Sequence, residues 1–196
     1  GLLDIPWFKS IPGLIIASPR DVADMEYMFS NLIQNCAMPA IVRYPKGYAP
    51  KRLARDSNTS NGLWLKVDVL RNGKEILLIG HGSVIPMLLE SCDKIAECYN
   101  INPTLVDLRF LKPLDLDTLD KLFVDHSLAI MAEESYATGG IGEQLLGFAH
   151  RANKHIQWVH MAVPDIYVPH GTREEQLRYV GICSDEVVKK VGEYLE

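Results

Sequence analysis

The sequence predicts an α/β protein with mostly parallel strands, built from a short βαβ unit and a larger α/β domain. Apolar runs of strand length alternate with amphipathic stretches of helix length along nearly the whole chain. Parallel strands are expected because a strand–helix–strand connection brings the second strand back in the same direction. A polar stretch at 48–62, rich in Ser, Asn and Thr, interrupts the alternation and predicts a linker between the two parts.

The first part, residues 1–47, contains one strand–helix–strand unit. Leu14–Ala17 is the first expected strand, and Ala40–Tyr44 is the second, after a helix break at Met38-Pro39. Between them, apolar residues recur at the spacing of one helix face: Val22, Met25, Met28, Phe29, Leu32 and Ile33. A unit of this size cannot bury both faces of a sheet, so we expect residues before Gly1, or a partner chain, to complete it.

The segment Ser18-Pro19-Arg20-Asp21 marks the start of this helix. We expect Ser18 to be the N-cap and Pro19 to take the first helical position. The carboxylate of Asp21, two residues further on, is then placed to reach back toward the cap.

Residues 48–74 are expected to hold the linker and a strand, Trp64–Leu70, that leads into the second domain at 75–196. The expected strands of that domain are Glu75–Ile79, Thr104–Leu108, Leu128–Ala132 and Ile156–Val163. The expected helices are Val84–Tyr99, Leu116–Val124, Gly142–His150 and a last helix from Ser184. Because strands and helices alternate, most of this sheet is expected to be parallel.

Composition and charge exclude several classes of function. The formal net charge is −5, without the basic stripe of a general nucleic-acid binder. Apolar runs such as Ile76–Ile79 are far shorter than the roughly 18 residues that a membrane span needs. Asp4 and Lys9 interrupt any signal-peptide core. We therefore expect a protein that binds neither nucleic acid nor membranes.

Neither the cysteines nor the histidines show metal-ligand spacing. The cysteines are Cys36, Cys92, Cys98 and Cys183, with no CxxC pair, and we interpret them as small buried or half-buried thiols in a reducing compartment. The six histidines are scattered, and none lies in an HExxH motif. We therefore predict no metal site in this chain.

Two glycine-containing turns follow expected strands and lead into helices. Gly80-His81-Gly82-Ser83 lacks the third glycine of the dinucleotide fingerprint, where Ile85 stands, so we interpret it as a turn with Ser83 as helix N-cap. Gly139-Gly140-Ile141-Gly142 has the form of an anion-binding nest. The carboxylates of Glu133-Glu134 lie just upstream and would repel a phosphate, so a structural turn is expected.

The Glu133-Glu134 pair also has the residue types of an acid–base catalyst. Adjacent residues at a strand end point to opposite faces, so the two carboxylates are not expected to share one substrate atom. Leu111–Asp115 is expected to be a turn after the preceding strand. Thr172, with Glu175 three residues later, has the pattern of a capping box. All three features are interpreted as architecture.

Two cations follow the second strand, in the segment Arg43-Tyr44-Pro45-Lys46-Gly47. Ligands of open α/β sheets bind beyond the carboxyl ends of the strands. Arginine can hold phosphate oxygens through two parallel hydrogen bonds, and lysine acts as a point charge. From spacing alone, Arg43 and Lys46 are either solvated loop residues or an anion site.

Several motifs resemble those of 1-deoxy-D-xylulose-5-phosphate synthases. They run in order over nearly the whole chain: Gly1–Ile5, Ser10–Pro12, Ala17–Asp21, Val42–Gly47, Val106–Asp115, Glu133-Glu134, Gly139–Gly142, Val163–Asp165 and His170-Gly171. The Asp-Leu-Arg…Lys-Pro-Leu-Asp and Gly-Gly-x-Gly pieces are shared with transketolases and pyruvate-dehydrogenase-type beta subunits. The Arg-Tyr-Pro-(Arg/Lys)-Gly stretch and the opening Gly-Leu-Leu-Asp favour the synthases.

This resemblance implies a transferase that depends on thiamine diphosphate and Mg²⁺. Enzymes of this family condense pyruvate with glyceraldehyde 3-phosphate, lose CO₂ and supply a precursor for isoprenoid, thiamine and pyridoxal biosynthesis. It also implies three α/β domains, a homodimer, and a cytoplasmic location in bacteria or a plastid location in plants and algae. Residues 1–47 would then be the end of the pyrimidine-binding domain, and residues 75–196 the complete transketolase C-terminal domain.

The resemblance implies few site residues within this chain. Lys46 stands where the family has a phosphate-contacting arginine, and lysine keeps the charge but loses the two-pronged geometry. Arg43 matches the first arginine of the motif, which is either a substrate contact or a structural group. The family's catalytic glutamate and its cofactor-binding segments would precede Gly1. No catalytic or cofactor-binding residue is therefore expected here, and this chain alone is expected to be inactive.

Two alternatives stay open from the sequence. The first is a transketolase or a pyruvate-dehydrogenase-type beta subunit, since both share the superfamily motifs. The second is a non-catalytic module that uses this fold for dimerisation or regulation. A second chain that copurifies would indicate a dehydrogenase subunit, whereas a single polypeptide of about three times this length would favour the synthase.

Overall fold

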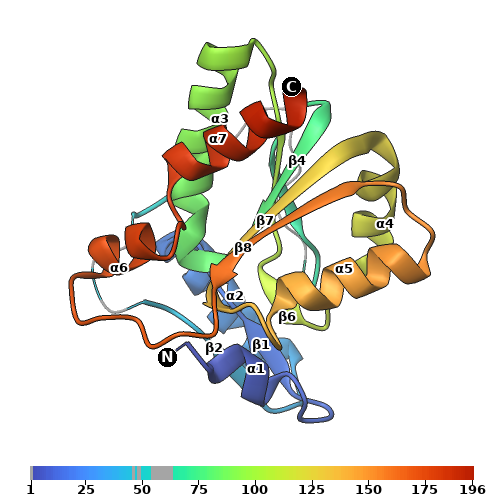
Figure 1. The fold of residues 1–196 in the computed structure, drawn as a ribbon. Helices are drawn as coiled ribbons and strands as arrows, with labels where there is room; N and C mark the ends of the chain where they lie inside the picture. Colours follow the sequence, from blue (N-terminus) through green and yellow to red (C-terminus); the bar gives the residue numbers. More distant parts are fainter. Residues whose placement is uncertain (1, 46, 48–49, 54–63) are drawn as a thin grey trace.

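The computed structural model describes residues 2–45, 47, 50–53 and 64–196. It shows an α/β fold with one large and one small sheet (Figure 1). The α/β class predicted from the sequence is confirmed. Most of the expected linker, residues 48–49 and 54–62, lies outside the described residues.

The large sheet has the strand order β3-β5-β4-β7-β8. Its strands are β3 (Asp68–Arg71), β4 (Glu75–Gly80), β5 (Thr104–Asp107), β7 (His126–Tyr136) and β8 (Gln157–Val163). The pairs β5–β4, β4–β7 and β7–β8 are parallel, and β3 runs antiparallel to β5. The prediction of a mostly parallel sheet is therefore confirmed, although the leading strand begins at Asp68 and not at Trp64.

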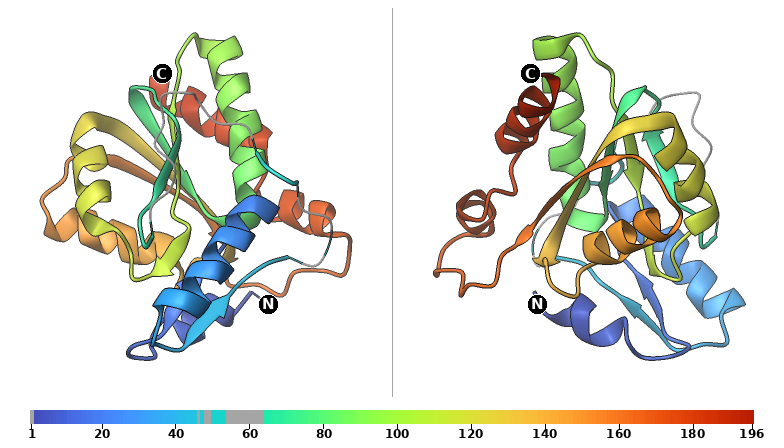
Figure 2. Two further views of the ribbon diagram at one scale, coloured as in Figure 1. Left: turned by 180° about the vertical axis from the view of Figure 1, so that it is seen from behind. Right: turned by 45° about the vertical axis from the view of Figure 1, so that its right-hand side comes forward.

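Helices cover both faces of the large sheet (Figure 2). They are α3 (Ile85–Tyr99) and α7 (Ser184–Leu195) on one face, and α4 (Leu116–Asp125) and α5 (Ile141–Arg151) on the other. Alternate residues of β4 serve the two faces: Ile76 and Leu78 pack with α3 and α7, and Leu77 and Ile79 pack with α4 and α5. Burial on both faces explains why this strand is a continuous apolar run.

The small sheet joins the two parts of the chain. Its strand order is β2-β1-β6, with β1 (Ile15–Ala17), β2 (Ala40–Val42) and β6 (Phe110–Lys112). β1 and β2 are parallel, as the predicted βαβ unit requires, and β6 pairs antiparallel with β1. The turn expected at Leu111–Asp115 is therefore wrong at its start, because its first two residues belong to β6. A strand from the second half of the chain thus supplies part of the pairing that the first unit lacks.

The start of α2 (Val22–Asn35) differs from the expected cap. Asp21, not Ser18, is the N-cap, because its side chain accepts a hydrogen bond from the N–H of Asp24 at 2.7 Å. The first two N–H groups of the helix, those of Val22 and Ala23, donate to the backbone carbonyls of Pro50 and Lys51. Residues 50–53 therefore close the start of α2, which a freely moving linker would not do.

Two further capping predictions had opposite outcomes. Ser83 is not a helix N-cap, because it lies inside the 3₁₀ turn η1 (Gly82–Val84), and α3 begins after that turn. The capping box of Thr172 and Glu175 is confirmed at the start of α6 (Arg173–Tyr179).

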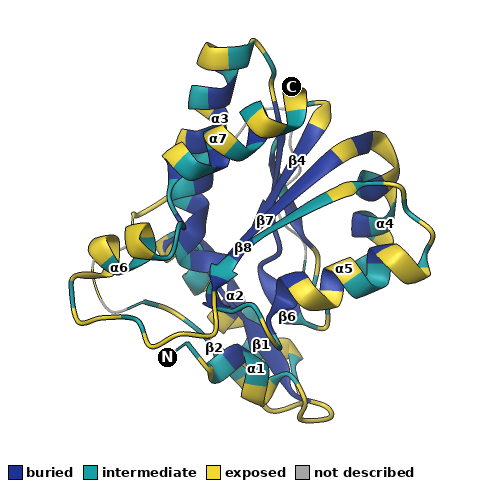
Figure 3. Ribbon diagram, viewed as in Figure 1, coloured by how far each residue is buried: buried dark blue, intermediate teal, exposed yellow. Residues whose placement is uncertain are grey.

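Burial is uneven over the molecule, as Figure 3 shows. The strands of the large sheet are almost fully buried, whereas the first unit exposes large apolar side chains, such as Trp7 at 66% and Ile33 at 79%. Trp7 belongs to α1 (Asp4–Phe8), a short helix that the sequence pattern did not predict.

Two other expectations concern single residues and membrane spans. Cys98 is exposed on α3, so the expectation that all four thiols are at least half buried is wrong for this one. Among the helices that the structure describes, none is long and apolar enough to cross a membrane.

Candidate functional site

Strand ends from both sheets meet where the small sheet joins the large one. The N–H of Ser18, just after β1, donates to the carbonyl of Arg109, and the N–H of Leu108 donates to the carbonyl of Gly80 at the end of β4. Carboxyl ends of parallel strands are where open α/β sheets bind ligands. The polar side chains at this junction form a buried arginine cluster, a buried histidine chain and an open polar cleft.

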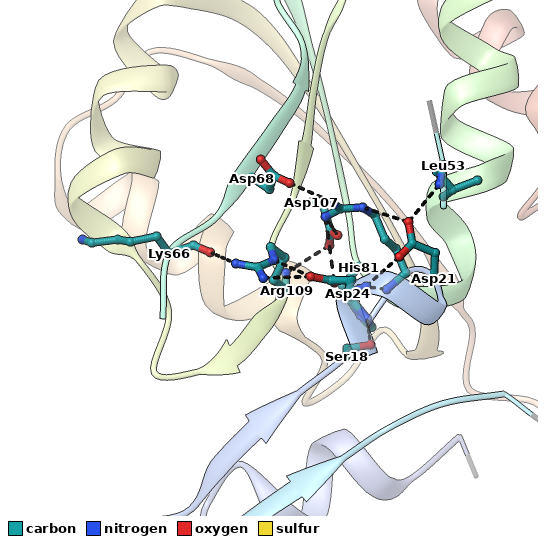
Figure 4. Close-up of polar contacts among 10 residues, drawn as sticks. Ser18, Asp21, Asp24, Leu53, Lys66, Asp68, His81, Asp107 and Arg109 are labelled. Atoms are coloured by element: carbon teal, nitrogen blue, oxygen red, sulfur yellow. Dashed lines mark hydrogen bonds and ion pairs between the residues drawn. The ribbon is translucent and has the colours of Figure 1, made fainter. Parts of the chain in front are cut away.

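The buried arginine cluster consists of Arg20, Asp24, Asp68, Asp107 and Arg109. Figure 4 labels the last four of these residues. Arg20 binds the carboxylates of Asp107 and Asp68 through its two terminal nitrogens, at 2.9 and 2.8 Å. Arg109 binds Asp24 Oδ1 through Nε at 2.9 Å and Nη2 at 2.8 Å. These contacts tie the loop after β1 and helix α2 to β3, β5 and the residues that follow β5.

Burial dominates the electrostatics of this cluster. The side chains of Asp68 and Asp107 are fully buried, and that of Arg109 is 2% exposed. Burial raises the pKa of Asp107 to about 7, although the guanidinium of Arg20 opposes the shift. Because these groups are largely buried and paired with one another, the cluster is suited to holding the two parts together and not to binding a substrate.

Arg109 has an unusual backbone for a side chain of its size. Its φ is +57°, in the left-handed region that residues other than glycine rarely adopt. Its N–H donates to the Asp107 carboxylate at 3.0 Å, and its carbonyl accepts from Ser18 at 2.7 Å. These bonds and the buried side chain hold the strained conformation in place.

The buried histidine chain runs from the first unit to the outer strand of the large sheet. Ser18 Oγ lies 3.0 Å from His81 Nδ1, and His81 Nε2 lies 3.9 Å from Glu133 Oε2. Glu133 Oε1 lies 2.8 Å from His160 Nε2 on β8. The order Ser–His–Glu has the residue types of a nucleophilic triad, but Ser18 and His81 are each only 1% exposed. No substrate can reach this serine in the present arrangement.

Glu133 explains the glycine-rich turn before α5. Its carboxylate accepts hydrogen bonds from the N–H groups of Ile141 at 3.0 Å and Gly142 at 2.8 Å. Burial by itself raises the pKa of Glu133, but the hydrogen bonds from His160 and this helix start, together with the nearby imidazole of His81, hold that pKa well below its usual range. A side-chain carboxylate therefore fills the place where a nest binds an anion, and the predicted structural turn is confirmed.

Gly142 is required at this turn for steric reasons. A Cβ atom there would lie 2.2 Å from His160 Nε2, far inside van der Waals contact. The glycine thus allows the imidazole to reach Glu133 across the start of α5.

The polar cleft is lined by Asp4, Arg43, Ser83, Glu134 and Arg173, and encloses about 630 Å³. Arg43 binds Asp4 Oδ2 through Nε at 2.7 Å and the Glu134 carbonyl through Nη2 at 2.7 Å. The Glu134 carboxylate accepts from Ser83 Oγ at 2.9 Å and from Arg173 Nε at 3.2 Å, and it also pairs with Arg173 Nη2.

The two adjacent glutamates do point to opposite sides, as predicted. Glu133 is fully buried at the start of α5, whereas Glu134 faces the cleft. One substrate atom could not contact both carboxylates, so the structure does not support a paired acid–base role for them. Partial burial and the nearby Arg43 lower the pKa of Arg173, which is a sign of a crowded cationic site.

The two sequence-predicted site residues have different outcomes. Arg43 lines the polar cleft, where its contacts join α1 to the end of β7. Lys46 lies outside the described residues, so its predicted phosphate contact stays a prediction.

Sequence reasoning missed the buried clusters. Arg20, His81 and Arg109 were not selected as site residues, although each lies in a motif directly after a strand. The sequence signal that could have indicated them is a charged or polar residue at a strand end, next to an otherwise apolar stretch. The pairing itself joins residues about 50 to 90 positions apart, which no local pattern reveals.

The second half of the chain matches one family of domains. A family model described as "Transketolase, C-terminal domain" matches residues 65–187. The chain belongs to the transketolase C-terminal domain family. The matched range extends from just before β3 into α7 and so includes the whole large sheet of this transketolase C-terminal domain.

Sequence relatives extend over the first unit as well. The chain is 31% identical to a 1-deoxy-D-xylulose-5-phosphate synthase of Natranaerobius thermophilus, over 100% of this chain and 32% of that protein. It is 29% identical to the enzyme of the same name from Haemophilus influenzae, over 100% of this chain and 30% of that protein. The chain therefore spans about a third of the length of these curated relatives.

Solved structures share the fold. One described as "Split gene transketolase, inactive beta4 tetramer" has a TM-score of 0.77 and 21% identity, over 98% of this chain and 61% of that chain. A transketolase mutant from Pichia stipitis has a TM-score of 0.74 and 13% identity, over 98% of this chain and 27% of that chain. At these identities the likeness concerns the fold alone.

Proposed function

We propose that this chain is part of a 1-deoxy-D-xylulose-5-phosphate synthase, which condenses pyruvate with glyceraldehyde 3-phosphate and releases CO₂. The observation that carries the proposal is the 31% identity to such a synthase, which extends over both units of the chain. We also propose that residues 1–47 are the end of a pyrimidine-binding domain, as the resemblance implies.

In this proposal the segment after β2 binds the phosphate of the aldehyde. Lys46 supplies the positive charge, and holding the phosphate fixes the aldehyde carbon in the geometry needed for attack. Arg43 acts as a positioning residue, three positions earlier in the same segment. Its bonds to Asp4 and to the Glu134 carbonyl anchor the start of that segment to α1 and β7.

Thiamine diphosphate, with Mg²⁺, supplies the decarboxylation and carbon–carbon bond chemistry when it is bound to such an enzyme. Among the described residues there is no group of three or more His, Cys, Asp or Glu side chains that could hold a metal ion. The acidic side chains of the buried arginine cluster are already paired with guanidinium groups. These carboxylates are therefore not free to hold Mg²⁺, and we propose that the cofactor and its metal bind to the rest of the protein.

Steady-state kinetics of the full-length enzyme test the role of Lys46. Replacing Lys46 with Ala should raise the KM for glyceraldehyde 3-phosphate at least tenfold, as expected for loss of a charge-assisted contact of about 1.5–3 kcal/mol. The KM for pyruvate should change little. The exposed lysine of α4 provides a matched control, because Lys121→Ala removes the same charge from a residue outside the segment after β2. Equal effects on both substrates, or none, would remove Lys46 from the site.

Calorimetry tests the proposal that the rest of the protein, and not this chain, binds the cofactor. The isolated 196-residue chain should form no 1-deoxy-D-xylulose 5-phosphate and should show no heat of binding for thiamine diphosphate with Mg²⁺. Tight binding by this chain alone would refute the assignment of the cofactor to the remaining residues.

The family match also allows a transketolase as the second candidate, because the model for residues 65–187 bears that family's name. Assays with ketose phosphate donors, compared with pyruvate, distinguish the two. We propose a homodimer in either case, which light scattering of the full-length protein can check.

A further inference from the structure

A second cavity lies between α2, α3 and α6, and encloses about 690 Å³. This volume is within the range of about 300–1,000 Å³ that small-molecule sites occupy. Its walls are mostly hydrocarbon, with side chains from both parts of the chain: Val22, Met25, Phe29, Met87, Leu177 and Ile182. Methionine and aromatic walls adapt well to an apolar ligand.

The two carboxylates that line this cavity are engaged elsewhere. Asp21 accepts from the N–H of Asp24 at 2.7 Å and from the N–H of Leu53 at 2.9 Å. Glu90 pairs with Lys94 at 2.8 Å and accepts from Ser184 at 2.9 Å. Asp21 also pairs with Arg20 of the cavity wall at 3.7 Å, so both carboxylates already have partners.

Of the two cationic side chains that line the cavity, Arg173 keeps one donor without a protein partner among the described residues. Arg173 uses Nε and Nη2 to bind Glu134 and the Ser83 carbonyl, and its Nη1 has no hydrogen-bond partner among the described residues. Arg20 also lines the cavity, but its guanidinium is already paired with Asp21, Asp24, Asp68 and Asp107. Arg173 Nη1 is therefore the donor that a ligand with an acceptor group can bind at this cavity.

We propose that this cavity binds a small molecule with a hydrocarbon body and one carboxylate. The carboxylate pairs with Arg173 at the rim, next to Ser83. The body lies against Met25 and Phe29 of α2 and Met87 of α3. Such a ligand bridges the first unit and the transketolase C-terminal domain, because α2 belongs to one and α3 and α6 belong to the other.

The body of the proposed ligand can be tested with straight-chain carboxylates. Binding of butanoate, hexanoate and octanoate to the full-length protein is measured by calorimetry. Affinity should rise about fourfold for each added methylene, because burying one methylene contributes about 0.8 kcal/mol. Phe29→Ala should reduce this gain, whereas Leu146→Ala, which removes a similarly exposed apolar side chain from α5, should not.

The head group is tested with octanamide, a neutral analogue of octanoate. Wild-type protein should prefer octanoate at least tenfold. Arg173→Gln should bring octanoate down to the level of octanamide, and Arg178→Gln on the same helix, whose side chain is 66% exposed, should leave the preference unchanged.

Three results would overturn the proposal. They are no saturable binding of octanoate, equal affinity for the acid and the amide in wild-type protein, or the same affinity in the Phe29 and Arg173 variants as in their controls. Each readout is binding alone, so the outcome is independent of the proposed synthase activity.

Discussion

The molecule contains two arginine–carboxylate clusters that differ mainly in access to solvent. In the buried arginine cluster, Arg109 is 2% exposed, and the carboxylates of Asp68 and Asp107 are fully buried. In the polar cleft, the side chains of Arg43 and Arg173 are 15% and 46% exposed. The residue types are the same, but the first cluster joins two parts of the chain and the second lines a space that a ligand can enter.

This difference shows how burial changes the role of an ion pair. Removing one member of a buried pair leaves an uncompensated charge, which is strongly destabilising. Removing one member of an exposed pair changes stability little, because water and salt screen the remaining charge. Five substitutions test this contrast, from the largest expected effect to the smallest.

Replacing Arg109 with Met should cause the largest loss of stability. The change leaves Asp24 buried without its cationic partner, so the free energy of unfolding should fall by about 3–5 kcal/mol. Urea unfolding at pH 7 measures it. The exposed Arg178→Met should stay within about 0.5 kcal/mol of wild type. A loss below 1 kcal/mol for Arg109→Met would mean that the buried cluster does not hold the two parts together.

Replacing Asp107 with Asn should change how stability depends on pH. The pKa of Asp107 is raised to about 7, so the folded state holds this proton more tightly than the unfolded state does. Its stabilising contribution is therefore complete below about pH 4 and is lost as pH rises to 7. At about 1.4 kcal/mol per pKa unit, the loss between pH 4.5 and 7 is on the order of 2–3 kcal/mol.

The measurement is urea unfolding of both proteins at pH 4.5 and pH 7. As pH rises, the free energy of unfolding of Asp107→Asn should increase relative to that of wild type, because the variant lacks this titrating group. A difference that does not vary with pH would show that Asp107 is ionised throughout.

The adjacent glutamates provide a matched pair for the same contrast. Glu133→Gln keeps the size of the side chain but removes a buried charge that binds His160 and the start of α5, and should cost about 2 kcal/mol. Glu134→Gln, in the cleft, should cost less than about 1 kcal/mol. Thermal unfolding of the two variants side by side shows which one loses more stability. A larger loss for Glu134→Gln would contradict the assignment of Glu133 to the buried side and Glu134 to the cleft.

Replacing Arg43 with Gln should have the smallest effect. Its partner Asp4 is 29% exposed, so the pair should contribute about 0.5–1 kcal/mol. A double-mutant cycle with Asp4→Asn isolates that coupling energy. A coupling energy well above about 2 kcal/mol would be typical of a buried ion pair. Arg43 would then resemble the arginines of the buried cluster, and a structural role would be enough to explain it.

The sequence predicted the features that depend on local pattern. Alternating apolar runs located the strands of the large sheet, and the Thr172 and Glu175 spacing located a capping box, because both signals depend on neighbours a few residues away. Strand β6 was missed because three residues followed by a proline have the pattern of a turn, and only pairing with β1 makes them a strand.

The site was predictable only in part for the same reason. Arg43 was selected from its place after a strand, and it does line the polar cleft. The partners that decide its chemistry, Asp4 and Glu134, come from α1 and β7, and only the folded chain brings them together. Ser18 was expected to cap a helix, yet its side chain contacts that of His81, which lies 63 residues further along the chain. Local capping preferences carry no information about such a long-range contact.

The pairing of β1 with β6 has a consequence for synthesis on the ribosome. β1 leaves the ribosome about 95 residues before β6 does, which at 5–20 residues per second is a delay of roughly 5–20 s. During that interval the nascent first unit has an unpaired strand edge close in sequence to the exposed Trp7 and Ile33. The growing chain should therefore need protection by a chaperone until its second half emerges.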